Sequence, residues 1–161
     1  MVFGVSKLAL RDELVRVLRA DLTTLERAQA ATREAATHEE AKPENDKDTR
    51  ALEQSYLARG QALRVAELQV GLAAVEAMAL TELPDTAPVT LGAIVTCEED
   101  EAHRTWFLAS HGGGTPLAEG RVQVVTPLSP LGRALLGKRV GDAFDVRIGD
   151  RVRELALVAV G

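Results

Sequence analysis

The chain has 161 residues, of which 46% are hydrophobic, 27% are charged and only 3% are aromatic. This is the composition of an ordinary soluble protein with one domain or two small ones. The net charge of −5 gives no strong overall attraction to nucleic acid, and no apolar run approaches the roughly 20 residues of a membrane span. The single cysteine, Cys97, excludes an intramolecular disulfide. With no signal-peptide pattern at the N-terminus, we expect a cytoplasmic protein in which Cys97 is a small strand residue.

Residues 6–37 are predicted to form a long helix. Ser6 is a suitable N-cap because its side-chain oxygen can accept a backbone N–H from the first turn. Apolar residues recur at intervals of three and four, which places them on one helix face. Toward the end of the helix this face thins to alanines. The residues of the face are Leu10, Leu14, Leu18, Leu22 and Leu25, followed by Ala28, Ala31, Ala35 and Ala36.

A second helix is predicted from Asp46 or Lys47 to Leu80. Its expected apolar stripe is Leu52, Tyr56, Leu63, Val70, Ala73 and Ala77, widened by Val65, Leu68, Leu72 and Val75. Two amphipathic helices with a short connector should fold back as an antiparallel pair. At 1.5 Å per residue, each arm of about 30 residues would be about 45 Å long.

The connector between the two helices is acidic and contains Pro43, which blocks helix continuation. We therefore predict a coiled-coil finger over residues 1–82 with an acidic tip at 38–48, followed by a linker at 83–88. The arginines of the first helix, which are Arg16, Arg19, Arg27 and Arg33, fit a solvated face with neighbouring acids or a basic strip toward RNA.

Residues 89–161 have the strand signals of a small β domain. Strands are predicted at 89–96, 104–110, 121–126, 143–148 and 151–160, with Gly149-Asp150 as a hairpin turn. A short helix is expected over 130–136, with Ser129 as its N-cap, Pro130 at its first position and Gly137 past its end. The predicted fold class is α+β: an antiparallel helical hairpin followed by a small antiparallel sheet with one short helix.

The segment from Leu128 to Asp142 carries three short motifs in order: Ser-Pro-Leu-Gly, Ala-Leu-Leu-Gly-Lys and Gly-Asp. This segment resembles the C-terminal signature of the GreA/GreB transcription elongation factors, and the order of helices, acidic connector and β domain is similar over nearly the full length. The resemblance implies an FKBP-like domain that docks at the rim of the RNA polymerase secondary channel. It also implies that the loop formed by the Ser-Pro-Leu-Gly motif contacts the polymerase, through Ser129, Pro130, Leu131 and Gly132.

The same resemblance implies a role for the acidic tip. In the family, tip carboxylates help to hold a second Mg²⁺ at the polymerase active site, which promotes cleavage at the 3′ end of backtracked RNA. Here the corresponding carboxylates are Glu44, Glu40 and Asp46, with Glu40 and Glu44 as the metal ligands. The chain would bind no cofactor alone and have no hydrolase site of its own.

One position departs from the family tip pattern Asp-x-x-Glu-Asn. Aligned on Glu44-Asn45, the first acid is replaced by Ala41, and Glu40 lies one residue away. Three hypotheses therefore stay open: a cleavage factor, a non-cleaving channel-binding regulator or inhibitor, and an FKBP-like interaction module with a coiled-coil dimerisation arm. The first two predict a monomer that does not associate with membranes. Such a monomer would act on the 3′ end of nascent RNA only indirectly, through the polymerase. The third predicts self-association through the helices. Independently of these hypotheses, the acids of the connector can be a solvated, charged loop at the end of a hairpin.

Overall fold

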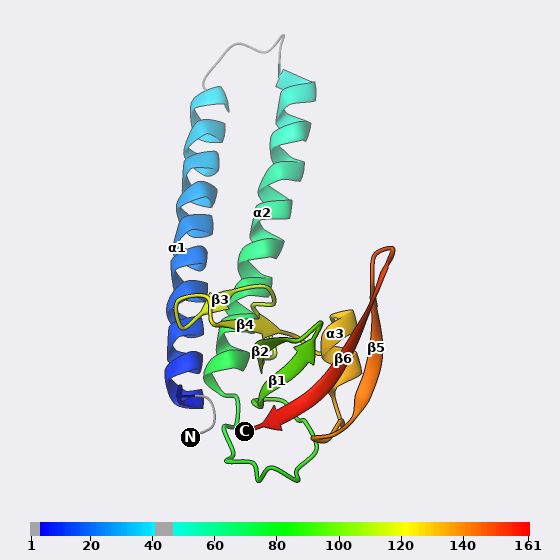
Figure 1. Ribbon diagram of the computed structural model, residues 1–161. Coiled ribbons are helices and arrows are strands. Elements are labelled where there is room, and N and C mark those ends of the chain that lie inside the picture. Colours follow the sequence, from blue (N-terminus) through cyan, green and yellow to red (C-terminus); the bar gives the residue numbers. More distant parts are fainter. Residues whose placement is uncertain (1–3, 41–46) are drawn as a thin grey trace. The chain divides into compact units, whose positions relative to one another are not determined.

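The computed structural model describes residues 4–40 and 47–161 (Figure 1). In the first long helix it describes side chains up to residue 38, and in the second from residue 49 onward. Helix α1 (Lys7–Glu40) begins directly after the predicted N-cap. The Ser6 hydroxyl oxygen accepts the Ala9 N–H at 3.1 Å, and the Ser6 carbonyl accepts the Leu10 N–H at 3.1 Å. These two bonds confirm the cap. The helix ends three residues beyond the predicted Thr37.

The chain forms two compact units, one of Met1–Arg16 with Ala73–Gly161 and one of Val17–Leu72. This division does not follow the predicted linker at residues 83–88, because the start of α1 and the end of α2 (Lys47–Glu76) belong to the unit that holds the sheet. Both long helices therefore contribute residues to both units. In the described ranges 4–40 and 47–161, no helix is long and apolar enough to cross a membrane.

The start of α1 is held within the first unit by apolar and polar contacts. Leu10 and Leu14 are fully buried. The Lys7 amino group is buried as well and donates to the Thr81 carbonyl, and burial lowers the pKa of this amine. These contacts fix the first turns of α1 against the rest of the unit.

A second polar contact joins the start of α1 to the turn between β3 (Pro116–Leu117) and β4 (Val122–Val125). The Glu13 carboxylate accepts the Ala118 N–H, at 3.0 Å and 3.2 Å to its two oxygens. Ala118 and Glu119 both have left-handed backbone conformations, with φ of 51° and 59°. The carboxylate thus satisfies a backbone donor in a turn that non-glycine residues rarely adopt.

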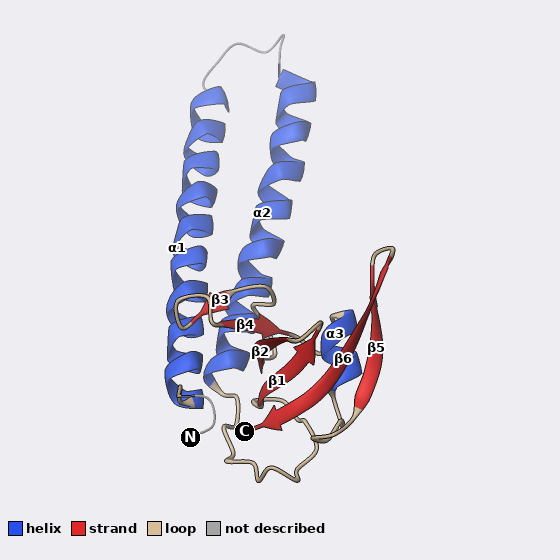
Figure 2. Cartoon of the chain, viewed as in Figure 1, coloured by secondary structure: helices blue, strands red, loops and turns tan. Residues whose placement is uncertain are grey.

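The second unit contains the outer parts of α1 and α2, which run side by side (Figure 2). The predicted leucines Leu22 and Leu25 are half-buried, and the stripe continues through Gln29, Thr32 and Ala36. The prediction for the three earlier alanines was wrong, since Ala28, Ala31 and Ala35 are exposed. Because an α-helix has 3.6 residues per turn, the positions on the buried face are spaced three or four residues apart, and these three alanines lie between them.

The predicted stripe of α2 was assigned to the wrong face. Exposed fractions are 57% for Leu52, 65% for Tyr56, 60% for Leu63 and 67% for Val70, and Ala73 and Ala77 are also exposed. The residues expected only to widen the stripe are the inner ones: Val65, Leu72 and Val75 are buried, and Leu68 is half-buried. Because α2 has apolar residues on opposite faces, periodicity alone could not choose between them. The helix also ends at Glu76, before the predicted Leu80.

The described residues of the first unit form a six-stranded sheet in the order β3-β4-β2-β1-β6-β5 (Figure 1). The remaining strands are β1 (Ile94–Glu99), β2 (Ala102–Leu108), β5 (Ala143–Ile148) and β6 (Arg151–Val160). The predicted bounds of the last two strands and the turn at Gly149 are confirmed. Pairing is antiparallel except between β2 and β4, where Thr105 lies opposite Val122 in a parallel ladder. The sheet is therefore mixed and not purely antiparallel as predicted, and β3 was missed.

The first predicted strand, at 89–96, starts only at Ile94. Val89 instead donates its N–H to the Lys138 carbonyl at 2.8 Å and accepts the Gly137 N–H at 2.9 Å. Helix α3 (Pro130–Leu135) packs against the sheet near β5, confirming the expected short helix. The core of this unit contains Trp106, Leu108, Leu135, Val146, Leu155 and Leu157.

Candidate functional site

The loop before α3 is shaped by Ser129. Its backbone is extended, with φ of −75° and ψ of 154°, and its hydroxyl oxygen accepts the Gly132 N–H at 3.0 Å. The same hydroxyl donates to the Thr126 carbonyl at 2.8 Å. Pro130 occupies the first helical turn, where its missing N–H leaves no bond unmade. Ser129 therefore closes the loop on one side and caps the helix on the other.

Gly132 lies directly against the backbone of the same loop. A Cβ added at this position would lie 1.9 Å from the Thr126 carbonyl oxygen and 2.6 Å from its carbon. No side chain fits there without moving the loop or the helix. The Ser-Pro-Leu-Gly motif is thus a single structural unit in which a cap, a helix-starting proline and a close backbone approach are combined.

The four predicted partner-binding residues divide between the surface and the core. Leu131 is only 7% exposed and Gly132 is buried, so both face inward and hold the loop in place. Ser129 is half-buried, and Pro130 is exposed. Their contact with a partner stays a prediction, and within the motif Pro130 offers the most accessible surface.

Sequence reasoning overlooked Leu128 as a site residue. Its side chain is 84% exposed, the largest value among the exposed large hydrophobic residues of the described chain. An isolated exposed leucine is ordinary. This one, however, directly precedes a loop held by the Ser129 hydrogen bonds and the close approach of Gly132. The signal available in the sequence was a leucine between Pro127 and the Ser-Pro pair, where no regular element could bury it.

The other two motifs shape the chain after α3. Gly137 has φ of 79°, which ends the helix in the left-handed conformation that glycine tolerates best. The Asp142 carboxylate accepts the Arg139 N–H at 2.8 Å, and Gly141 between them has φ of 98°. These residues therefore position the entry into β5.

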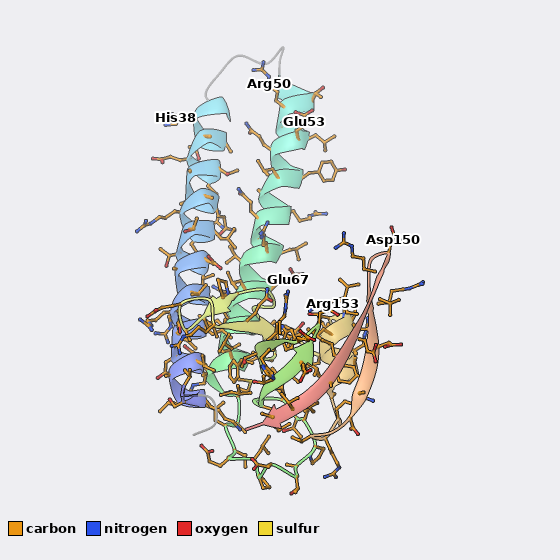
Figure 3. The ribbon with its side chains drawn as sticks, in the orientation of Figure 1. His38, Arg50, Glu53, Glu67, Asp150 and Arg153 are labelled. Atoms are coloured by element: carbon orange, nitrogen blue, oxygen red, sulfur yellow. The ribbon has the colours of Figure 1, made fainter. Side chains whose placement is uncertain are left out.

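The predicted tip residues Glu44 and Asp46, with Ala41, lie outside the described residues. Glu40 is the last residue of α1, and its side chain also lies outside the description. Figure 3 shows the labelled side chains of His38 near the end of α1 and of Arg50 and Glu53 near the start of α2. Among residues 4–40 and 47–161, no group of three or more His, Cys, Asp or Glu side chains could hold a metal ion.

A cluster that the sequence did not predict joins three strands of the sheet. Arg153 on β6 donates twice to the Glu99 carboxylate, with both N···O distances 2.5 Å, and Arg104 on β2 approaches it at 3.3 Å. The Arg153 hydrogen bond holds the pKa of Glu99 below its usual range. The Glu99 side chain is 13% exposed, so the bidentate pair is largely shielded from water.

Cys97, on the same strand as Glu99, is fully buried, which confirms the expected strand cysteine. Burial raises the pKa of its thiol to about 12. The thiol is therefore neutral at physiological pH, which leaves it with little nucleophilic character.

We predict opposite effects for two glycine-to-alanine substitutions. Gly132→Ala places a methyl group on the Thr126 carbonyl and should lower the free energy of unfolding by about 3 kcal/mol or more. Gly60→Ala, in the middle of α2 with no atom within 4 Å of the added Cβ, should raise helix stability by up to about 1 kcal/mol. Urea unfolding followed by circular dichroism measures both, and equal effects would contradict the close approach.

We predict that Glu99→Gln lowers the free energy of unfolding by about 2 kcal/mol at pH 7. The folded-state pKa of Glu99 is below its ordinary 4.5, so the pair stabilises the fold above that value and this stabilisation is lost as the pH falls through the folded-state pKa. The difference between wild type and variant, measured by urea unfolding from pH 7 downward, should therefore shrink below about pH 4.5. Glu98→Gln is the control, because the Glu98 side chain is 50% exposed and should show a much smaller difference.

Comparison with known proteins places these motifs in a family. The family model "Transcription elongation factor, GreA/GreB, C-term" matches residues 84–161. The transcription elongation factor GreA of Rhodospirillum rubrum is 31% identical over 101 residues, which cover 61% of this chain and 62% of that protein. The match thus spans less than two thirds of the relative's length.

Solved structures give similar neighbours. Gfh1 of Thermus aquaticus is 20% identical, with a TM-score of 0.41 and coverage of 97% of this chain and 96% of that one. A GreA/GreB elongation factor from Nitrosomonas europaea is 25% identical, with a TM-score of 0.38 and coverage of 60% and 78%. The matched segment includes the Ser-Pro-Leu-Gly, Ala-Leu-Leu-Gly-Lys and Gly-Asp motifs, so residues 84–161 are similar to the C-terminal domain of GreA/GreB factors, and the comparisons support a divergent relative of that family.

Proposed function

We propose that this chain regulates transcription elongation by binding bacterial RNA polymerase at its secondary channel. The observation that carries the proposal is the GreA/GreB C-terminal domain at residues 84–161, preceded in the same chain by two long helices of 34 and 30 residues. At 1.5 Å per residue, helices of this length reach about 45–50 Å. Such arms suit a factor that docks with one part and inserts another.

The docking surface in this proposal is the loop at residues 126–132. Leu128 and Pro130 are its exposed apolar members, and the Ser129 hydrogen bonds and the close approach of Gly132 hold the loop in one conformation. A contact residue on a rigid loop loses little conformational freedom when it binds. The loop is therefore suited to meet a preformed apolar pocket on a protein surface.

The connector supplies the chemistry in this proposal. Glu40, Glu44 and Asp46 are hard oxygen donors of the kind that Mg²⁺ prefers, and one or two of them can complete a site held mainly by another protein. When bound, such a metal orients and activates the water that cleaves backtracked RNA. The chain itself would contribute carboxylates and no independent active site.

One observation favours a second function of the same architecture. Ala41 occupies the position of the first family tip acid and cannot bind a metal. A factor that enters the channel without the full pair of carboxylates would occupy it and inhibit or remodel transcription without cleavage. Substituting this one residue separates the two functions.

We predict that the chain stimulates RNA cleavage in stalled, backtracked elongation complexes and that Glu44→Ala abolishes this stimulation. Glu53→Ala, which removes an exposed acid on α2 outside the tip, should cleave like the wild type. The measurement is the release of short 3′ RNA fragments in the presence of Mg²⁺. If the wild type binds but does not cleave, whereas Ala41→Asp does, the second function holds; no binding to polymerase leaves the interaction module with a coiled-coil arm.

We predict that Leu128→Asp weakens polymerase binding at least tenfold without changing thermal stability. The leucine is 84% exposed, so its replacement disturbs no packing in the free protein. Val158→Asp, at another exposed apolar position of the sheet, is the control and should bind normally. Binding is measured by fluorescence anisotropy of labelled chain titrated with polymerase. Equal affinities for wild type and Leu128→Asp would rule out this docking loop.

A further inference from the structure

Helix α2 is apolar on two opposite faces. In the second unit, the inner face places Gln54, Ala58 and Gln61 in half-buried positions. Larger apolar side chains lie on the outer face, where Leu52, Tyr56, Leu63 and Val70 are all more than half exposed. We call these four residues the outer stripe. The inner face thus begins with small and polar residues and continues through Val65, Leu68 and Leu72, while the larger apolar residues of the outer face remain in water.

The spacing of the outer stripe is that of one of the two core positions of a coiled-coil heptad. Tyr56, Leu63 and Val70 are separated by seven residues each, and Leu52 lies four residues before Tyr56. A seven-residue apolar repeat keeps one helix face against a second helix. The stripe extends over 19 residues, from Leu52 to Val70, or about 27 Å of helix. A partner that covers it is therefore expected to be another helix.

The sequence around the stripe is complementary to itself about Leu63. Tyr56 and Val70 lie seven residues on either side of Leu63. Arg59 and Glu67 lie four residues on either side, and neither makes an ion pair within the described part of the chain. Glu67 is labelled on α2 in Figure 3. An antiparallel second copy would therefore bring Val70 to Tyr56, Leu63 to Leu63 and Glu67 to Arg59.

We propose that the outer stripe is a dimerisation surface for a second copy of this chain. The two α2 helices run antiparallel, with the twofold axis at Leu63, so that Arg59 of each copy reaches Glu67 of the other. Small residues lie at the crossing, because Gly60 and Ala66 are three residues on either side of Leu63. Small side chains at these levels let the two helix backbones approach closely.

Charge selects this orientation. In a parallel dimer, identical residues lie at the same level, which sets Arg59 against Arg59 and Glu67 against Glu67. In the antiparallel dimer, Arg59 of each copy lies at the level of Glu67 of the other. A closed twofold dimer of this kind uses the same patch on both copies and leaves no free stripe for further growth. A seam of four apolar residues per copy is small, so the dimer is weak and depends on protein concentration.

This inference goes beyond the proposed function and does not depend on it, because a weak dimer dissociates at low concentration to the monomer that the channel-binding hypotheses predict. The dimer uses α2 residues 52–70, whereas the docking loop and the tip carboxylates lie elsewhere in the sequence. Self-association is measured on the protein alone, and polymerase binding and cleavage are measured separately. Failure of one therefore does not imply failure of the other.

The test is sedimentation equilibrium of the full chain over about 1 to 500 μM, a range that covers weak dimers. We expect the average mass to rise from monomer toward dimer, and Leu63→Glu to weaken the association at least tenfold. Leu57→Glu is the matched control, since Leu57 is a 54% exposed leucine of the same helix that lies off the outer stripe. A wild type that stays monomeric throughout, or a control that weakens association equally, overturns the proposal.

A charge swap tests the register and does not rely on the apolar substitution. Arg59→Glu and Glu67→Arg should each weaken dimerisation several-fold, because each places like charges at the same level. The double variant should restore it to within about threefold of the wild type, as expected for a directly coupled pair. Circular dichroism checks that the helix content of all variants is equal. Weakening by each single substitution without restoration in the double variant contradicts the antiparallel pairing.

Discussion

The organisation of the chain depends on the burial of two leucines at the start of α1. Leu10 and Leu14 are fully buried within the unit that contains the sheet, and burial of each contributes about 1.5–3 kcal/mol. Hydrogen bonds from Lys7 to the Thr81 carbonyl and from the Ala118 N–H to Glu13 fix the orientation of the first turns of α1 within this unit. Without these buried residues, α1 would have only the partly polar packing of the second unit to stabilise it.

The fold could be predicted well where one residue type has one physical use. Ser6 and Ser129 as caps, Pro130 at a helix start and Gly149 in a turn were all predictable, because each choice has a local cause. Errors arose where long-range partners decide. The parallel pairing of β2 with β4 and the short strand β3 depend on residues that are distant in sequence.

The faces of α2 were ambiguous for the same reason: both carry apolar residues, and only the position of α1 distinguishes them. The site shows the same limit. The motif loop was found, but sequence alone could not tell that Leu131 and Gly132 are buried while Leu128 is exposed. Nor could it predict the Glu99–Arg153 pair, which requires knowing that β1 lies beside β6. The tip acids stay a prediction from resemblance alone.

The buried thiol of Cys97 has a practical consequence. It is the only cysteine in the chain, it has no exposed surface, and its pKa of about 12 keeps it protonated. Maleimides and disulfide reagents react with accessible thiolates, so the native protein should react with them only very slowly. A cysteine introduced on the surface would then be the only reactive handle, and fluorophores or crosslinkers could be attached at one chosen position without first removing a native residue.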